Sequence, residues 1–171
     1  EAEVREAVRR LKAEGVEAVA VCFLFSFLNP AHEQRVRAIL QEEFPEAYLS
    51  LRSEVAPTFR EYESFSTTAI NAYLGPKTSS YIGHLADSLR EKGIPCEVRL
   101  MQSQGGVATI DAAGERPVSI LMSGPVAGLV GGIWAGKSGG FTNIITLDVG
   151  GTSADIGVAP RGETRMRHVL D

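Results

Sequence analysis

The chain has 171 residues, of which 44% are hydrophobic and 22% are charged, and its formal net charge is −4. This composition is typical of an ordinary soluble globular protein with one domain or two partial ones. The acidic balance excludes the basic surface that binds nucleic-acid phosphates, so we expect no nucleic-acid partner.

The first third of the chain alternates helical and strand-like patterns. A charged amphipathic helix ends at Gly15, and the almost unbroken apolar run at residues 16–25 predicts a strand covered on both faces. Asn29 and Pro30 predict the start of a second helix, with a side-chain cap followed by a ring at the first helical position. A second strand is expected at residues 47–51. This order is typical of a βαβ unit.

A long helical pattern then runs through residues 62–89, and a break is expected at Gly75–Pro76. Residues 96–102 are strand-like, and the sequence SQGG at 103–106 predicts a turn. A second α/β block follows, with an apolar stretch at residues 118–122 and a helix that begins at Ser123.

Residues 118–136 form nineteen positions without a charge and with small residues at a spacing of four. Five glycines and Pro125 interrupt this stretch, whereas membrane-spanning helices are predominantly apolar. We therefore expect a buried packing helix and no membrane association. Trp134 is interpreted as a core or interface residue.

The cysteines and histidines, which are common metal ligands in proteins, are scattered along this chain. Cys22 and Cys96 lie in apolar runs without C-x-x-C spacing, and we interpret them as reduced core thiols of a cytoplasmic protein. A disulfide between them is the alternative. His32, His84 and His168 have no metal-ligand spacing and are interpreted as surface or strand-end residues.

Residues 131–138, GGIWAGKS, match the P-loop pattern G-x-x-x-x-G-K-[ST]. A P-loop needs a strand before it and a helix after it. Here a helical segment precedes Gly131, and Gly139 and Gly140 follow. We therefore interpret the match as the end of a helix that Gly136 terminates.

A second glycine-rich stretch, NIITLDVGGTSADIGVA at residues 143–159, predicts two strands joined by a tight turn. Gly150 and Gly151 would let backbone amides approach a ligand closely. The hydroxyls of Thr152 and Ser153 add donors, and such a concave set of donors suits phosphate oxygens. These residues are the predicted nucleotide-phosphate site.

Two carboxylates flank this turn. Asp148, at the end of the first strand, is expected to hold a divalent cation or its water shell opposite the phosphates. Asp155 is expected to position water or to make a second contact in the metal shell. An ordinary hairpin, in which both acids bond turn amides, remains the alternative on these residues alone.

The stretch from Ser123 to Ala159 resembles part of the actin-like ATPase superfamily. SGPVAGLVGGIWAG is similar to the interdomain helix of that superfamily, and LDVGGTSAD is similar to its second phosphate-binding hairpin. The resemblance implies an α/β fold with actin-like ATPase (ribonuclease H-like) lobes, in which helices flank mixed sheets, incomplete in this chain.

The resemblance narrows to the hydantoinase A/5-oxoprolinase family, which includes acetone carboxylase subunits. It is carried by SEVAPTFREYESFSTTAINAYL, MQSQGG, SGPVAG and DVGGTSAD, which follow one another in the family's order. Four residues depart from the family pattern. Ser64 stands where arginine is usual, Gln104 where asparagine is usual, and Val149 and Ala154 replace Met and Thr. None of these removes a charged or phosphate-facing group from the hairpin.

The resemblance also implies a domain division. Residues 1–56 would be the end of an N-terminal lobe, and residues 57–171 the start of a second lobe. This second lobe would contain the interdomain helix at 123–138 and the phosphate hairpin at 143–159. Family members are several-fold longer, so we expect an internal piece that alone binds ATP poorly and catalyses nothing.

The activity implied is ATP-dependent hydrolysis of a cyclic amide, of the N-methylhydantoinase or 5-oxoprolinase type, with ATP and Mg²⁺ as cofactors. The implied partners are a small cyclic-amide substrate and a large second subunit similar to hydantoinase B. The alternatives are an ATP-dependent carboxylase subunit similar to acetone carboxylase, or a non-enzymatic ATP-switched module.

Overall fold

The computed structural model describes residues 1–164, so His168 lies outside the described part. The chain divides into two units. The first unit comprises Glu1–Cys96 and Ile110–Val118, and the second comprises Glu97–Thr109 and the chain from Ser119 onward. Each unit is described by itself.

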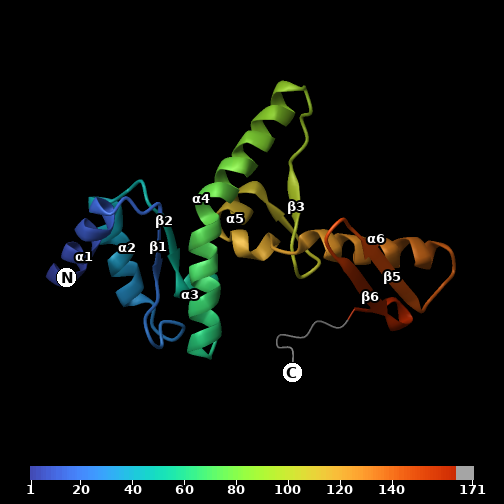
Figure 1. The fold of residues 1–171 in the computed structure, drawn as a ribbon, viewed down its shortest axis with the longest axis horizontal. Coiled ribbons are helices and arrows are strands. Elements are labelled where there is room, and N and C mark those ends of the chain that lie inside the picture. Colours follow the sequence, from blue (N-terminus) through green and yellow to red (C-terminus); the bar gives the residue numbers. More distant parts are fainter. Residues whose placement is uncertain (165–171) are drawn as a thin grey trace. The chain divides into compact units, whose positions relative to one another are not determined.

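The first unit contains two strands and five helices (Figure 1). In chain order these are α1 (Ala2–Ala13), β1 (Ala18–Val21), α2 (Ala31–Glu43), β2 (Tyr48–Leu51), α3 (Arg52–Val55), α4 (Glu61–Glu91) and α5 (Ile110–Glu115).

A parallel pair of strands lies at the centre of the first unit. β1 and β2 pair from Ala18↔Tyr48 to Val21↔Leu51, which confirms the predicted βαβ order. Helices α1 and α2 cover one face of the pair, and α4 lies along the other (Figure 1). The core on the α1–α2 side consists of Val8, Val21, Val36, Ile39, Leu40, Phe44 and Leu51.

Strand β1 is shorter than the run at residues 16–25 predicts. The amide of Phe23 donates to the buried carboxylate of Glu33 at 2.9 Å and not to a neighbouring strand. Phe25 then takes a positive φ of 59°, and the chain turns away from the sheet. The side chains of Phe23, Leu24 and Phe25 are therefore exposed, and the expectation of a strand covered on both faces is wrong here.

The second predicted helix begins one residue later than expected, so Pro30 is its N-cap. Asn29, expected to be the cap, lies one residue before it, and its Oδ1 accepts a hydrogen bond from the amide of Ala31 at 3.1 Å. Both thiols are free: Cys22 is half-buried and Cys96 is exposed. The expected core position is thus wrong for Cys96, and the alternative disulfide does not form. Burial raises the pKa of Cys22.

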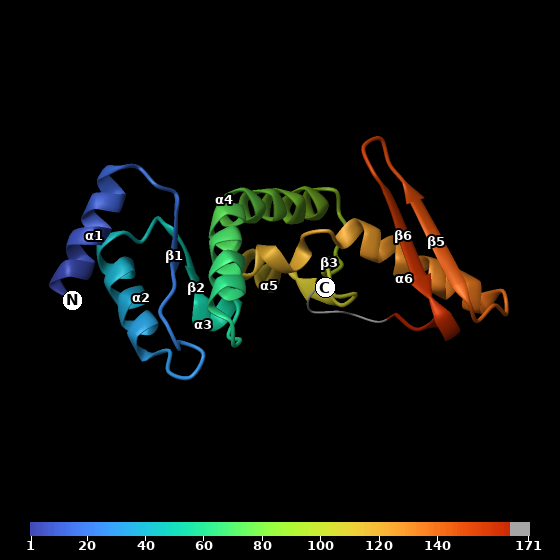
Figure 2. The same cartoon turned by 60° about the horizontal axis from the view of Figure 1, so that its bottom comes forward.

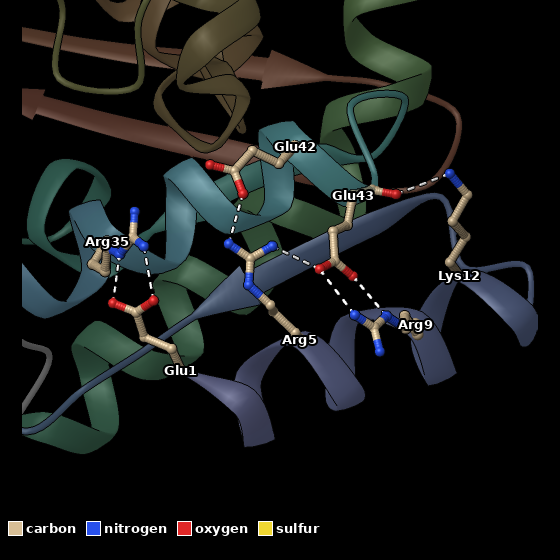
Figure 3. Close-up of polar contacts among 7 residues, drawn as sticks. All are labelled: Glu1, Arg5, Arg9, Lys12, Arg35, Glu42 and Glu43. Atoms are coloured by element: carbon tan, nitrogen blue, oxygen red, sulfur yellow. Dashed lines mark hydrogen bonds and ion pairs between the residues drawn. The ribbon is translucent and has the colours of Figure 1, made fainter.

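Ion pairs near the surface join α1 to α2 (Figure 3). Arg5 contacts Glu43 at 2.7 Å, and Arg9 contacts the same carboxylate at 3.0 Å. The hydrogen bond from Arg5, reinforced by Arg9, holds the pKa of Glu43 below its usual value. Solvent screens such pairs, so each adds little to stability.

Helix α4 continues through the break expected at Gly75–Pro76, but its axis changes direction near its middle (Figure 2). Pro76 cannot donate the helical hydrogen bond to residue 72, which explains why the helix bends there but does not end. Gly75 permits close packing, because a Cβ there would lie 2.2 Å from the ring of Tyr48. The Tyr48 hydroxyl donates to the carbonyl of Gly114 at 2.8 Å.

The second unit contains two antiparallel hairpins and a helix. Its elements are β3 (Arg99–Met101), β4 (Val107–Thr109), α6 (Ser123–Ser138), β5 (Ile144–Val149), β6 (Ala154–Ala159) and a 3-10 turn (Pro160–Gly162). The predicted turn at residues 103–106 joins β3 to β4, and Gly105 has a φ of +86°. The structure adds β4 and α5, which the sequence patterns did not predict, and residues 117–120 form a 3-10 helix.

Helix α6 is continuous from Ser123 to Ser138, so the GGIWAGKS segment is helical and cannot form a P-loop. Within residues 1–164, no helix has the length and apolar character needed to cross a membrane. The expectation that α6 is buried is wrong in this structure: none of its residues is buried, and Trp134 is 74% exposed. Only one side of the helix contacts the hairpin of β5 and β6.

Candidate phosphate and metal site

The predicted site lies on the antiparallel hairpin of β5 and β6. The strands pair from Ile144↔Ala159 to Val149↔Ala154, and Asp148 lies directly opposite Asp155. Since side chains alternate along a strand, both acids share the face that packs on α6. The opposite face carries Ile145, Leu147, Val149, Ile156 and Val158, with 60–75% of each exposed.

The inner face of β5 packs against a row of glycines on α6. A Cβ at Gly132 would lie 2.3 Å from Thr146 Cγ2, and one at Gly136 would lie 2.8 Å from Ile144 Cδ1. Real Cβ atoms do not come this close to other atoms. The strand can therefore approach the helix this closely only because the helix has glycines at these positions.

At the end of this row, a Cβ at Gly128 would lie 3.5 Å from Asp148 Oδ2. The predicted metal-binding carboxylate therefore lies beside the backbone of α6. Sequence reasoning noted small residues at a spacing of four but not their partners. That spacing places Gly128, Gly132 and Gly136 on one side of a helix, and it was the available signal for this packing.

The two acids have no neutralising cation in the described chain. Like charges placed directly opposite each other in a sheet are destabilising. Neither Asp148 nor Asp155 forms a salt bridge within residues 1–164. The same residues contain no group of three or more His, Cys, Asp and Glu side chains able to hold a metal ion. Mg²⁺ does not need such a group, because it uses one or two carboxylates, water and substrate phosphates.

The turn between the strands changes the expected role of Gly150. Its amide donates to the Ser153 carbonyl at 2.9 Å, so this donor is used within the turn. Gly150 can still give a ligand room, but the expectation of a free amide there is wrong.

Gly151 differs from Gly150. A Cβ at Gly151 would meet no atom within 4 Å, so packing in the described chain does not require glycine there. Gly151, Thr152 and Ser153 are exposed and adjacent, and they remain the predicted phosphate contacts. The two opposed carboxylates are suitable ligands for Mg²⁺, and the two hydroxyls and the open glycine are suitable contacts for phosphate oxygens. The chemistry of these residues therefore fits a phosphate group with its Mg²⁺.

Two of the three histidines can be placed. His32 is exposed on α2, and His84 is exposed on α4, which agrees with their interpretation as surface residues.

Sequence reasoning missed a buried polar cluster in the first unit. Glu33 is fully buried and accepts the amides of Phe23 at 2.9 Å and Ser53 at 2.8 Å. Burial acts to raise the pKa of Glu33, but these hydrogen bonds outweigh it and hold the pKa below the ordinary value of 4.5. Arg52, also fully buried, lies in the same part of the unit.

Two protein-family models match this chain. The model of the hydantoinase/oxoprolinase family matches residues 64–170, and that of the hydantoinase/oxoprolinase N-terminal region matches residues 1–44. The chain therefore belongs to the hydantoinase/oxoprolinase family.

Similar sequences include the alpha subunit of caprolactamase from Pseudomonas jessenii, 37% identical over 97% of this chain and 24% of the relative. The gamma subunit of acetophenone carboxylase from Aromatoleum aromaticum is 36% identical over 100% of this chain and 24% of its own length. The 5-oxoprolinase from Saccharomyces cerevisiae is 30% identical over 100% of this chain and 13% of its own length.

Among solved structures, ATP-dependent caprolactamase from Pseudomonas jessenii has a TM-score of 0.83 and 37% identity, with 92% of this chain and 23% of that one covered. Nucleotide-free acetone carboxylase also has a TM-score of 0.83, at 28% identity, with 94% of this chain and 23% of its own covered. The chain thus spans about a quarter or less of the relatives named here.

Proposed function

We propose that this chain is the phosphate-binding part of a longer enzyme that uses ATP to hydrolyse a cyclic amide, of the hydantoinase or 5-oxoprolinase type. The observation that carries the proposal is the pair of opposed carboxylates, Asp148 and Asp155, beside an open glycine turn. The caprolactamase and 5-oxoprolinase relatives support the choice of substrate class, because both names denote enzymes of cyclic amides.

Phosphoryl transfer requires a protein chiefly to position its reactants and to neutralise charge. Gly151, Thr152 and Ser153 would hold phosphate oxygens of ATP. Asp148 would hold Mg²⁺, and Asp155, on the same face of the hairpin, would orient water or the metal's water shell. The bound Mg²⁺ would offset the negative charge of the phosphates and of the two carboxylates.

The reaction we propose begins with transfer of the γ-phosphoryl group from ATP to the amide oxygen, which releases ADP. Water then attacks the activated carbon, and the ring C–N bond breaks as the nitrogen takes up a proton, which leaves an acyl phosphate. A second water hydrolyses this acyl phosphate to the carboxylate and free phosphate. This order overcomes the resonance stability of the amide before the ring opens. The described residues would act only in the phosphoryl step.

A complete ATP site would need chain outside these 171 residues. We propose that residues 1–56 end one lobe and that residues 57–171 begin the other, with the nucleotide held between the lobes of the whole protein. The segment alone would bind ATP weakly and lack activity. A second large subunit is proposed because caprolactamase alpha and acetophenone carboxylase gamma are named as subunits. We propose a cytoplasmic location for the assembled enzyme.

The test is ATP hydrolysis by the full-length protein, expressed with its second subunit. Caprolactam, hydantoin and 5-oxoproline form one set of substrates, and acetone with bicarbonate forms the other. Stimulation by a cyclic amide, with release of the ring-opened acid, supports the proposal. Stimulation only by the ketone with bicarbonate would assign a carboxylase, and ATP hydrolysis that no substrate stimulates would indicate a switched module.

A further inference from the structure

The longest helix of the first unit exposes a face that is more apolar than the face it buries. Helix α4 contacts β1, β2 and α5. The residues that it buries are mostly small or polar: Ser64, Thr68, Asn71, Ala72, Gly75 and Ile82. In an ordinary surface helix, the apolar residues face the core and the polar residues face water. Helix α4 reverses this distribution.

The exposed face of α4 carries three of the four tyrosines of the chain. Tyr62, Tyr73 and Tyr81 are 83%, 77% and 67% exposed, and Ile70 between them is 45% exposed. Their spacings of eight, three and eight residues keep all four on one side of a helix with about 3.6 residues per turn. We call these four side chains the tyrosine face.

Contacts on the buried side fix the rotation of α4 about its axis. Asn71 Nδ2 donates to Ser50 Oγ on β2 at 2.9 Å, and Asn71 Oδ1 accepts from the amide of Val118 at 3.1 Å. Gly75 lies so close to the ring of Tyr48 that a Cβ would overlap it. Turning the helix to bury its tyrosines would break these hydrogen bonds and force a larger side chain against Tyr48. The fold therefore holds the tyrosine face outward.

The tyrosine face has the extent and the chemistry of a protein–protein interface. From Tyr62 to Tyr81 the helix rises by about 28 Å, at 1.5 Å per residue. This length is close to the width of the patch of about 800 Å² that each partner contributes to a typical stable interface. Residues 64–83 contain a single charge, that of Lys77. Tyrosine is enriched and charge is depleted at the centre of such interfaces.

The residue types on this face favour a separate chain as its partner. The core cluster on the α1–α2 side of the sheet consists of aliphatic residues and one phenylalanine, without a tyrosine. A tyrosine differs from these residues because its hydroxyl can bond water while its ring is exposed. Such a face suits a chain that folds first and assembles later. The caprolactamase and acetophenone carboxylase relatives are named as subunits, so their names also indicate a partner chain.

We propose that the tyrosine face of α4 binds the second large subunit of the assembled enzyme. This inference rests on the second subunit that is part of the proposed function, and it adds the surface that the subunit contacts. The partner surface that fits is apolar, with oxygen atoms that accept hydrogen bonds from the tyrosine hydroxyls. A carboxylate on that surface would pair with Lys77.

The test is the affinity of the purified full-length protein for its purified second subunit, measured by analytical ultracentrifugation. In Tyr73→Lys, the new side chain suits an exposed helix, but the interface would bury its charge. We expect the dissociation constant to rise by at least about 100-fold. Tyr73→Phe keeps the ring, so its constant should change by less than about tenfold. His32→Lys, at an exposed position of α2, is the control and should bind like the native protein.

The free full-length chain distinguishes this partner from two others. Tyr73→Lys should leave the thermal midpoint and the sedimentation of the free chain unchanged, because only the second subunit covers the tyrosine face. A midpoint lowered by about 5 °C or more would show that the rest of the same chain covers this face. Conversion of a native dimer into monomers would show that a second copy covers it. Either result overturns the inference.

Failure of this inference can be told apart from failure of the proposed function. If the native protein binds the second subunit and Tyr73→Lys binds it equally well, only the location of the interface is wrong. If the native protein forms no complex with that subunit, the proposed partner is wrong as well. The stimulation of ATP hydrolysis by cyclic amides tests the proposed reaction independently of both results.

Discussion

The two units of this chain treat charge in opposite ways. In the first unit, Glu33 and Arg52 are fully buried, and their charged groups are met by backbone amides, carbonyls, hydroxyls and an opposite charge. In the second unit, Asp148 and Asp155 face each other across a hairpin with no salt-bridge partner within residues 1–164.

We propose that this difference separates structural charges from functional ones. A buried charge whose hydrogen-bonding capacity is filled within the chain is available to hold the fold but not to bind a ligand. An opposed pair of acids that the fold does not neutralise costs stability, and it lowers that cost when it binds a cation. We therefore expect substitutions in the first unit to change stability and substitutions at the acid pair to change activity.

The largest effect is expected at the acid pair. Asp148→Asn keeps the shape of the side chain and removes its charge, so ATP hydrolysis by the full-length enzyme should fall by at least about 100-fold. The thermal midpoint should stay the same or rise, because the opposed charges no longer repel. Asp87→Asn, at an exposed acid paired with Arg90, is the control and should keep full activity. Native turnover in Asp148→Asn would remove this residue from the mechanism.

The next effect concerns the buried carboxylate. Glu33→Gln replaces an acceptor with an amide group that cannot accept from both Phe23 and Ser53. One buried donor is then left unpaired, and we expect a loss of about 1–3 kcal/mol in unfolding free energy. Chemical denaturation of the full-length protein measures it, with the exposed Glu14→Gln as the matched control. Equal stability of the two variants would contradict a structural role for Glu33.

Close packing of the hairpin on α6 gives a smaller effect. Gly132→Ala would place a Cβ 2.3 Å from Thr146 Cγ2, which forces the strand away. The cost of overpacking, about 1–3 kcal/mol, exceeds the gain of up to about 1 kcal/mol from alanine in a helix.

Two variants check the cause of this loss. Adding Thr146→Ser removes the clashing methyl group and should restore stability. Gly131→Ala meets no atom within 4 Å and should stabilise the protein. A loss in Gly131→Ala as large as that in Gly132→Ala would show that the close approach to β5 is not the reason.

The pH dependence of stability should identify the same carboxylate. The pKa of Glu33 lies below 4.5 in the folded state, so the unfolded chain binds its proton more readily. The contribution of Glu33 is therefore complete above about pH 4.5 and declines as the pH falls through the folded pKa. Acid titration should show a shallower loss of stability in Glu33→Gln than in the native protein. Parallel curves would exclude Glu33 as a source of acid sensitivity.

The smallest effect is expected at the ion pairs of α1 and α2 (Figure 3). Arg9→Ala leaves Glu43 still paired with Arg5, so the thermal midpoint should move by less than about 2 °C. The difference should disappear in high salt, because salt screens exposed charges. A shift that persists in salt would indicate a packing role for the Arg9 side chain.

Local sequence patterns predicted the elements whose signals are contained within a few residues. Asn29 and Pro30 marked the start of α2, and Gly150 and Gly151, between two strand-like runs, marked the hairpin. The end of β1 could not be predicted in this way. The Phe23 amide donates its hydrogen bond to the buried carboxylate of Glu33, which lies on the next helix. The strand therefore ends because of a contact with a residue outside the strand.

The candidate site shows the same limit. The glycines and acids of residues 148–155 were predicted from their order and from the family resemblance. The hydrogen bond of the Gly150 amide could not be predicted, because it depends on how the turn closes on Ser153. Arg52 gave no signal either, because one arginine after a strand looks like a surface residue. Only the contacts of its side chain with Ser26, Ser64 and Glu61 show that it is buried.

The outward face of the β5–β6 hairpin has a practical consequence for handling this segment. Five bulky aliphatic side chains are exposed there, next to strand edges that no other strand within residues 1–164 pairs. This combination favours sheet-to-sheet association between copies. Produced by itself, the 171-residue segment should self-associate as its concentration rises, and replacing Leu147 and Ile156 with lysine should keep it dispersed.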